Sequence, residues 1–292
     1  MDIRNIKENP DILEEQDILE EMYKLSDEQF EGYKVIEGLP DYPLNVNPKN
    51  SQTILKDFIG RVTEELMEGY ESLLNIVAIL KPVGWNIDKV EDYNTIINHL
   101  QNANEEQADA MGFFLVLLRY SNILPEDIYV WANTHNPPEG TTKIDGSKYH
   151  PLDTLIVHGI YQQLIEKDLM GSNHTYEIFN EKLVKEHTHL DYQSLKGIIP
   201  GFTHLSEPLI EEHVVYLWKV IYHLNIARNL LKNRPWKQTQ VITKEIDFQE
   251  ALVKAFIYYL GYLGINYFDS VGLYTLFFKK QKLNLWRQQT NY

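Results

Sequence analysis

The chain has 292 residues, of which 43% are hydrophobic and 24% charged, the balance of a globular protein with a substantial core. It contains no cysteine, which excludes disulfide scaffolds and thiolate metal sites. Asp and Glu number 42 against 27 Lys and Arg, so a formal net charge of −15 argues against broad contact with nucleic acid.

Neither a membrane span nor a secretory signal is expected from the sequence. No apolar run reaches the roughly 18 residues that a membrane helix requires. The first residues are acidic, whereas a secretory signal begins with basic residues and continues into an apolar run. We therefore expect a cytoplasmic protein that has no membrane partner.

Apolar residues recur at helical spacing along most of the chain. Ile18, Met22 and Leu25 stand three and four positions apart, and the stretch 58–77 repeats this pattern. Strand alternation is hardly visible, so the sequence predicts an all-α fold. Further helices are predicted at 104–121, 152–168, 175–186, 209–232, 248–264 and 268–287, and loops at 38–50, 134–151, 197–208 and 233–236.

The first candidate site is a pair of carboxylates in the helix predicted around 58–77. Glu65 and Glu68 stand three positions apart, which brings their side chains onto neighbouring parts of one helix surface. In so acidic a chain the pair also arises by chance, and Glu64, Glu68 and Glu71 lie opposite the apolar stripe. Two interpretations of this pair therefore remain: a solvated helix face and a role in metal binding.

A second pair, Glu106 and Asp109, leads directly into 110–118, a segment that is apolar on every side and hence predicted to be buried. Burying an unpaired carboxylate costs several kcal/mol, so such a group acquires a cation, a hydrogen-bonding partner or a proton. If the two pairs face each other, four carboxylates converge. Such hard oxygen ligands suit Mg²⁺, which keeps waters and substrate phosphates in its remaining positions.

Few basic residues lie near the second pair along the chain. Between Glu64 and Asp109 the chain offers only Lys81 and Lys89, so we expect no cluster of basic residues to neutralise the carboxylates. The alternative is structural, because Glu105 and Glu106 would also favour the positive end of a helix dipole if the helix began there.

The segment 133–151 has no apolar periodicity and divides the chain into two halves. Each half combines a Trp, a polar connection and a strongly apolar helix that opens with Glu, which suggests an old duplication. We therefore predict an N-terminal helical half with the carboxylates (1–132), an insertion or flap (133–214) and a C-terminal helical half (215–292), which together form one catalytic domain.

The end of the chain is a basic exception, with four Lys and Arg residues in positions 279–287. Lys280, Asn284 and Arg287 are spaced by four and three residues, so one helix face offers cationic and amide donors that suit phosphate oxygens. The alternative is that cations favour the C-terminus of any helix.

These three features, in this order, resemble the dimeric all-α dUTPases and their phage dCTPase-dUTPase relatives, within the MazG-like superfamily of all-α NTP pyrophosphohydrolases. The ExxE and ExxD metal motifs of that family are similar to Glu65–Glu68 and Glu106–Asp109. Its Lys-rich turn followed by NxxRQ and a terminal Tyr is similar to Lys280–Gln288 and Tyr292. The resemblance covers roughly 15–130 and 215–292, and leaves the middle of the chain unmatched.

The resemblance implies a helical bundle of the NTP pyrophosphohydrolase type with two degenerate repeat halves, acting as a homodimer. It implies magnesium-dependent hydrolysis of dUTP to dUMP and pyrophosphate, in the cytoplasm, which for a phage protein is that of the host. By this resemblance the catalytic, metal-binding residues are Glu65, Glu68, Glu106 and Asp109. The substrate-binding residues are Lys280, Lys282, Asn284, Arg287, Gln288 and Tyr292.

One departure leaves the base open. The family has Gln and Asn side chains that contact uracil on its N-terminal helix, whereas this chain has Ser-Asp-Glu-Gln at 26–29. A pyrophosphohydrolase for dCTP, dTTP or a modified deoxynucleotide is therefore one alternative. A catalytically inactive homologue, serving as a helical binding or regulatory protein, is another.

Overall fold

The computed structural model describes residues 3, 6–12, 17–84, 89–134, 150–168, 207–233, 238, 241–266 and 268–290. Within these ranges all regular structure is helical and no strand occurs, which confirms the predicted all-α class. The main helices are α1 (Ile18–Glu37), α2 (Lys49–Leu80), α3 (Tyr93–Tyr120), α4 (Pro125–Thr134), α5 (Pro151–Asp168), α8 (Glu207–Leu230), α9 (Glu245–Ile265) and α10 (Ser270–Thr290).

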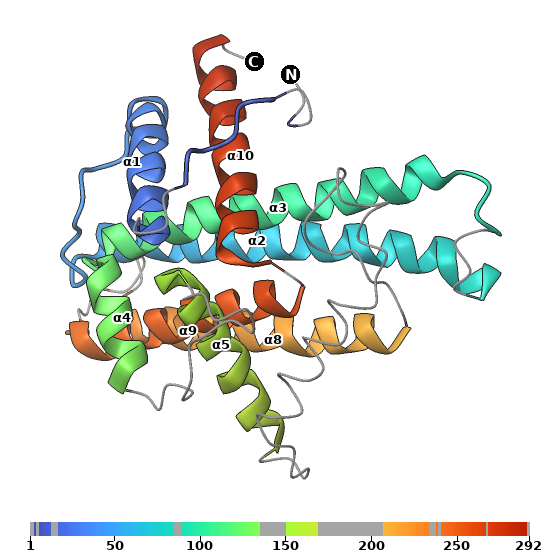
Figure 1. Ribbon diagram of the computed structural model, residues 1–292. Coiled ribbons are helices and arrows are strands. Elements are labelled where there is room, and N and C mark those ends of the chain that lie inside the picture. Colours follow the sequence, from blue (N-terminus) through green and yellow to red (C-terminus); the bar gives the residue numbers. More distant parts are fainter. Residues whose placement is uncertain are drawn as a thin grey trace.

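Helices α2 and α3 form a long pair that runs through the middle of the molecule (Figure 1). On one side of this pair, α1 and α10 stand next to each other and contact α3; on the other side lie α8 and α9 (Figure 1). None of the described helices has both the length and the apolarity that crossing a bilayer demands.

Most predicted helices agree with the structure to within a few residues, but α3 begins well before the predicted start at 104. Asp92 caps this helix, because its side chain accepts hydrogen bonds from the backbone N–H of Asn94 and the hydroxyl of Thr95. Glu105 and Glu106 therefore lie inside α3, far from its first turn. The alternative that they serve the positive end of the helix dipole is wrong.

One main hydrophobic core contains side chains from each of the helices α1 to α5 and α8 to α10, and α3 contributes a long run of it. The ring of Phe114 stacks on that of Tyr259 from α9, with centroids 5.4 Å apart. The hydroxyl of Tyr259 donates a 2.7 Å hydrogen bond to the carbonyl of Gln107. These contacts fix the buried side of α3, so that its opposite side faces α1 and α10.

Helix α5 belongs to the same bundle, although it falls within the predicted insertion 133–214. It crosses α9 at Gly159 and Gly261, where each backbone occupies the space that the other's Cβ would need. The predicted helix 175–186 lies outside the described residues, and the division of the chain into three parts stays a prediction.

Candidate metal centre

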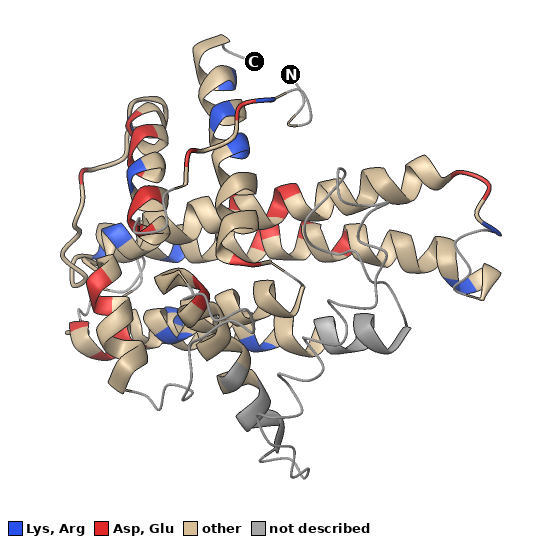
Figure 2. Ribbon diagram, in the orientation of Figure 1, with Lys and Arg blue, Asp and Glu red and all other residues tan. Residues whose placement is uncertain are grey.

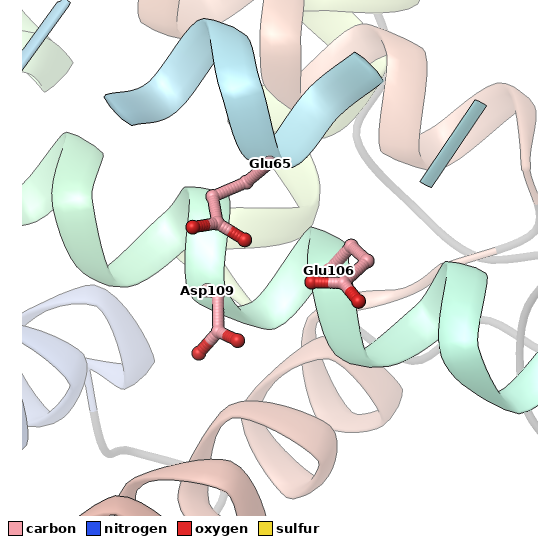
Figure 3. Close-up of side chains that lie close together, drawn as sticks. All are labelled: Glu65, Glu106 and Asp109. Atoms are coloured by element: carbon pink, nitrogen blue, oxygen red, sulfur yellow. The ribbon is translucent and has the colours of Figure 1, made fainter. Parts of the chain in front are cut away.

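Three of the four predicted metal ligands come together. Glu65 projects from α2 over α3, and Glu106 and Asp109 project from the neighbouring stretch of α3 (Figure 3). Each offers a carboxylate oxygen, and these oxygens all lie within 4.8 Å of one another. All three side chains are half-buried, as the apolar surroundings of the second pair predicted.

Close packing of α2 on α3 brings these carboxylates together. Gly69 lies one turn after Glu65, and a Cβ atom there would stand 2.8 Å from Nε2 of Gln107 and 3.4 Å from Cβ of Glu106. The missing side chain thus lets the two helices approach at the level of the cluster.

Glu68 is exposed and lies outside this group of three among the described residues. Its negative charge nevertheless raises the pKa values of Glu65 and Glu106. The first pair was expected either to form a solvated helix face or to bind metal. The solvated face applies to Glu68, whereas Glu65 turns toward α3.

The cluster holds more negative charge than it can carry without a cation or a proton. Burial raises the pKa of Glu65 to about 8, and the neighbouring charge of Asp109 and a hydrogen bond with Glu106 act in the same direction. Burial also raises the pKa of Glu106, although its hydrogen bond with Glu65 and the charge of Lys280 oppose the rise. Burial and the neighbouring carboxylates thus favour the protonated form of Glu65 in the absence of a metal ion.

Helix α10 supplies the only cation that contacts the cluster within the described ranges. Nζ of Lys280 lies 2.8 Å from Oδ2 of Asp109 and 3.3 Å from Oε2 of Glu105, and the Lys280 side chain is only 5% exposed. Burial lowers the pKa of Lys280, but Asp109 and then Glu105 raise it overall, so the ammonium stays charged. No cluster of basic residues was expected from the stretch between Glu64 and Asp109, and the one cation that pairs with Asp109 comes from a distant part of the chain.

The other predicted substrate residues on α10 divide between two sides of the helix. Asn284 donates to Oδ1 of Asp109 at 3.3 Å, and Arg287 donates to Oδ1 of Asn284 at 3.5 Å. Gln288 donates to the backbone carbonyl of Gln29 on α1 at 3.3 Å. These three residues lie on the side of α10 that Lys280 occupies.

Lys282 lies elsewhere. It is exposed, its ammonium lies 3.9 Å from Glu8, and it stands over the ring of Phe278. The structure therefore does not bring Lys282 to the cluster. Tyr292 lies outside the described residues.

A narrow cleft opens beside Asp109, between α1, α2, α3 and α10, with a cavity volume of about 30 Å³. Its walls include Gln29, Phe30, Phe58, Arg61, Phe113 and Gln281. Gln281 is 1% exposed, and neither atom of its amide group has a hydrogen-bond partner in the described part of the chain. Gln281 was not among the residues predicted from the sequence, although it stands next to Lys280 and three positions before Asn284.

The three carboxylates fit a divalent ion that prefers hard ligands. In an Mg²⁺ octahedron, oxygens at neighbouring positions lie about 3.0 Å apart and those at opposite positions about 4.2 Å apart, so the three oxygens, now within 4.8 Å of one another, would reach one ion after shifts of about 1 Å. Glu65, Glu106 and Asp109 would hold the ion, and Asp109 also lines the cleft.

Neither a protein-family model, nor a curated protein, nor a solved structure matches this chain. The family resemblance therefore rests on the motifs themselves. The geometry of the carboxylates and of α10 carries the functional argument.

Proposed function

We propose that this protein is a magnesium-dependent deoxynucleoside triphosphate pyrophosphohydrolase, and that its preferred reaction converts dUTP to dUMP and pyrophosphate. The observation that carries this proposal is the meeting of Glu65, Glu106 and Asp109 within 4.8 Å, on two different helices. A bound divalent ion supplies charge neutralisation at the phosphates and lowers the pKa of water.

The residues of α10 would hold the phosphates next to this centre. Arg287 is half-buried, and its guanidinium can bind phosphate oxygens bidentately. The amides of Asn284 and Gln288 add neutral donors on the same side of the helix. Glu68, exposed next to Glu65, is proposed as a further ligand or as the acceptor of a proton from the attacking water.

The base would enter the cleft beside Asp109. Phe30, Phe58 and Phe113 offer flat apolar faces, and Gln29 and Gln281 offer amides that can present either a donor or an acceptor. A volume of about 30 Å³ holds only one or two waters, so α1 or α10 must move outward to admit a base.

The same amides leave the base open, because uracil and cytosine present opposite donor and acceptor patterns that a rotated amide can match. Hydrolysis of dCTP, dTTP or a modified deoxynucleotide is therefore the alternative within this class. A homodimer in the cytoplasm is proposed from the family resemblance, and light scattering on the purified protein tests the dimer.

A panel of deoxynucleoside triphosphates with Mg²⁺, with products resolved by chromatography, tests the activity. The proposal predicts monophosphate and pyrophosphate, most rapidly from dUTP. Release of diphosphate and phosphate would contradict the reaction type, and faster turnover of dCTP or dTTP would reassign the base.

A second candidate is an inactive homologue that serves as a binding or regulatory protein. It is favoured by the ion pair of Lys280 with Asp109, which already neutralises one carboxylate of the cluster. Calorimetric titration with Mg²⁺ and a nonhydrolysable dUTP analogue separates the two candidates. An inactive scaffold would show no metal-dependent binding of the analogue.

A further inference from the structure

Lys280 is shared between two carboxylates that differ in their relation to the candidate metal centre. Asp109, at 2.8 Å, belongs to the group of three oxygens that can surround one ion. Glu105, at 3.3 Å, lies outside that group among the residues that the structure describes. Figure 2 shows the acidic residues in the middle of α3 beside the basic residues of α10.

A divalent ion and the ammonium of Lys280 compete for Asp109. Like charges that share one carboxylate repel each other, so occupation of the centre weakens the bond between Lys280 and Asp109. Lys280 cannot simply retreat into water, because its side chain is 5% exposed and packed within the bundle. A buried ammonium without a carboxylate partner is strongly unfavourable.

Glu105 provides the partner that Lys280 then needs. It lies on the same helix as Asp109, one turn before it, and already contacts the ammonium. A small movement of Nζ from Asp109 toward Glu105 would free Oδ2 of Asp109 while Lys280 remains paired.

We propose that Lys280 is the resident counter-ion of the metal-free centre, and that Glu105 is a positioning residue that retains Lys280 when a divalent ion takes Asp109. This inference rests on the proposed metal centre and adds Glu105, which lies outside both carboxylate motifs. The exchange keeps α10 docked on α3 in both states. It thereby preserves the wall that α10 contributes to the cleft.

Calorimetric titration of the full chain with Mg²⁺ alone tests the exchange. Lys280→Met removes the competing cation, so the Kd for Mg²⁺ should fall roughly tenfold. Glu105→Gln leaves Lys280 without its second partner, so the Kd should rise roughly tenfold. Glu71→Gln is the matched control, since Glu71 is exposed on α2, and its Kd should stay within about twofold of wild type.

The double variant shows whether Glu105 acts through Lys280. If it does, Glu105→Gln has no further effect once Lys280 is Met, and the double variant binds Mg²⁺ as Lys280→Met does. A general loss of negative charge would instead weaken binding equally in both backgrounds and would overturn the proposal. An unchanged or raised Kd in Lys280→Met would also overturn it.

Two further measurements keep the outcome decisive. If Lys280→Met does not fold, the test rests on two comparisons. Glu105→Gln must bind Mg²⁺ more weakly than Glu71→Gln does, and Glu105→Asp must restore part of the affinity. The proposal fails if either result is absent. Wild-type protein is titrated first. If the wild-type protein does not bind Mg²⁺, the metal centre itself is rejected. If Lys280→Met and Glu105→Gln both bind Mg²⁺ with the wild-type Kd, only the exchange is rejected.

Discussion

Gly69 on α2 lies directly against Gln107 on α3, so that a Cβ atom at Gly69 would stand 2.8 Å from Nε2 of Gln107. Gln107 is fully buried, and its backbone carbonyl is held by Tyr259. The amide of Gln107 ends a flexible side chain, whereas the backbone carbonyl oxygen of Ala103 and Cβ of Glu106, each 3.4 Å from the same point, have less freedom to move. The spacing of the candidate metal centre depends on this contact, because Glu65 and Glu106 flank it.

Replacing Gly69 by Val should push α2 away from α3 and separate the carboxylates. We expect the Kd for Mg²⁺ to rise at least roughly tenfold, since small displacements of such groups have large effects. Gly60→Val is the control, because Gly60 is exposed on the same helix with open space around it. Equal Mg²⁺ affinity in the two variants would show that the contact does not set the cluster.

The raised pKa of Glu65 predicts a pH dependence of stability in the absence of metal. Its pKa rises from 4.5 to about 8 on folding, so the folded state retains a proton that the unfolded chain releases. The stability that this retained proton contributes is fully present below pH 4.5 and is lost as the pH rises to about 8. The thermal midpoint should therefore fall between about pH 5 and pH 8, and less steeply in Glu65→Gln.

Mg²⁺ binding should show the opposite trend over the same range. An ion at the centre must displace the proton that the raised pKa of Glu65 retains, so the affinity for Mg²⁺ should increase with pH and level off near pH 8. Titrations in buffers of different ionisation enthalpy measure the released proton. Proton-independent binding would place the ion elsewhere.

The crossing of α5 and α9 predicts a large effect from one methyl group. In Gly159→Ala the added Cβ would collide with the backbone of Ile257 and Gly261, which cannot move aside as a side chain can. The free energy of unfolding should fall by about 1–3 kcal/mol or more. Gly60→Ala should instead gain about 0.5–1 kcal/mol, because Ala favours a helix. Denaturant titrations compare the two.

Gln52 links α2 to the segment before it and to the connection between α8 and α9. Its amide donates to the carbonyl of Val46 and the hydroxyl of Thr243, and its oxygen accepts from the backbone N–H of Asn233. Gln52→Ala removes three buried hydrogen bonds and should cost about 1–3 kcal/mol of unfolding free energy. Thr53→Ala, at an exposed neighbour, should stay within about 0.5 kcal/mol.

Much of the fold followed from spacing along the chain. Apolar periodicity located α5 and α8 to α10 to within a few residues and the middle of α2, whose start lies nine residues before the recognised pattern at 58–77. It missed the first part of α3, where Asn94, His99 and Gln101 interrupt the apolar pattern and only the cap at Asp92 reveals the start. Segments without apolar faces carry little periodic signal.

The site was predictable only in part. Spacing placed Glu106 and Asp109 on one face, and the structure brings Glu65 to them. Sequence could not separate Glu65 from Glu68, since that depends on how α2 is rotated against α3 at Gly69. Nor could it pair Lys280 with Asp109, because a contact between residues so far apart depends on how α10 docks.

Pyrophosphate release from dUTP, measured with Mg²⁺ for wild type, Glu106→Gln and Glu71→Gln under identical conditions, tests the central claim most directly. The three-carboxylate centre predicts rapid release by wild type and Glu71→Gln, and at least a roughly hundredfold loss in a folded Glu106→Gln. Wild-type rates in Glu106→Gln would contradict it and would remove the cluster from the reaction.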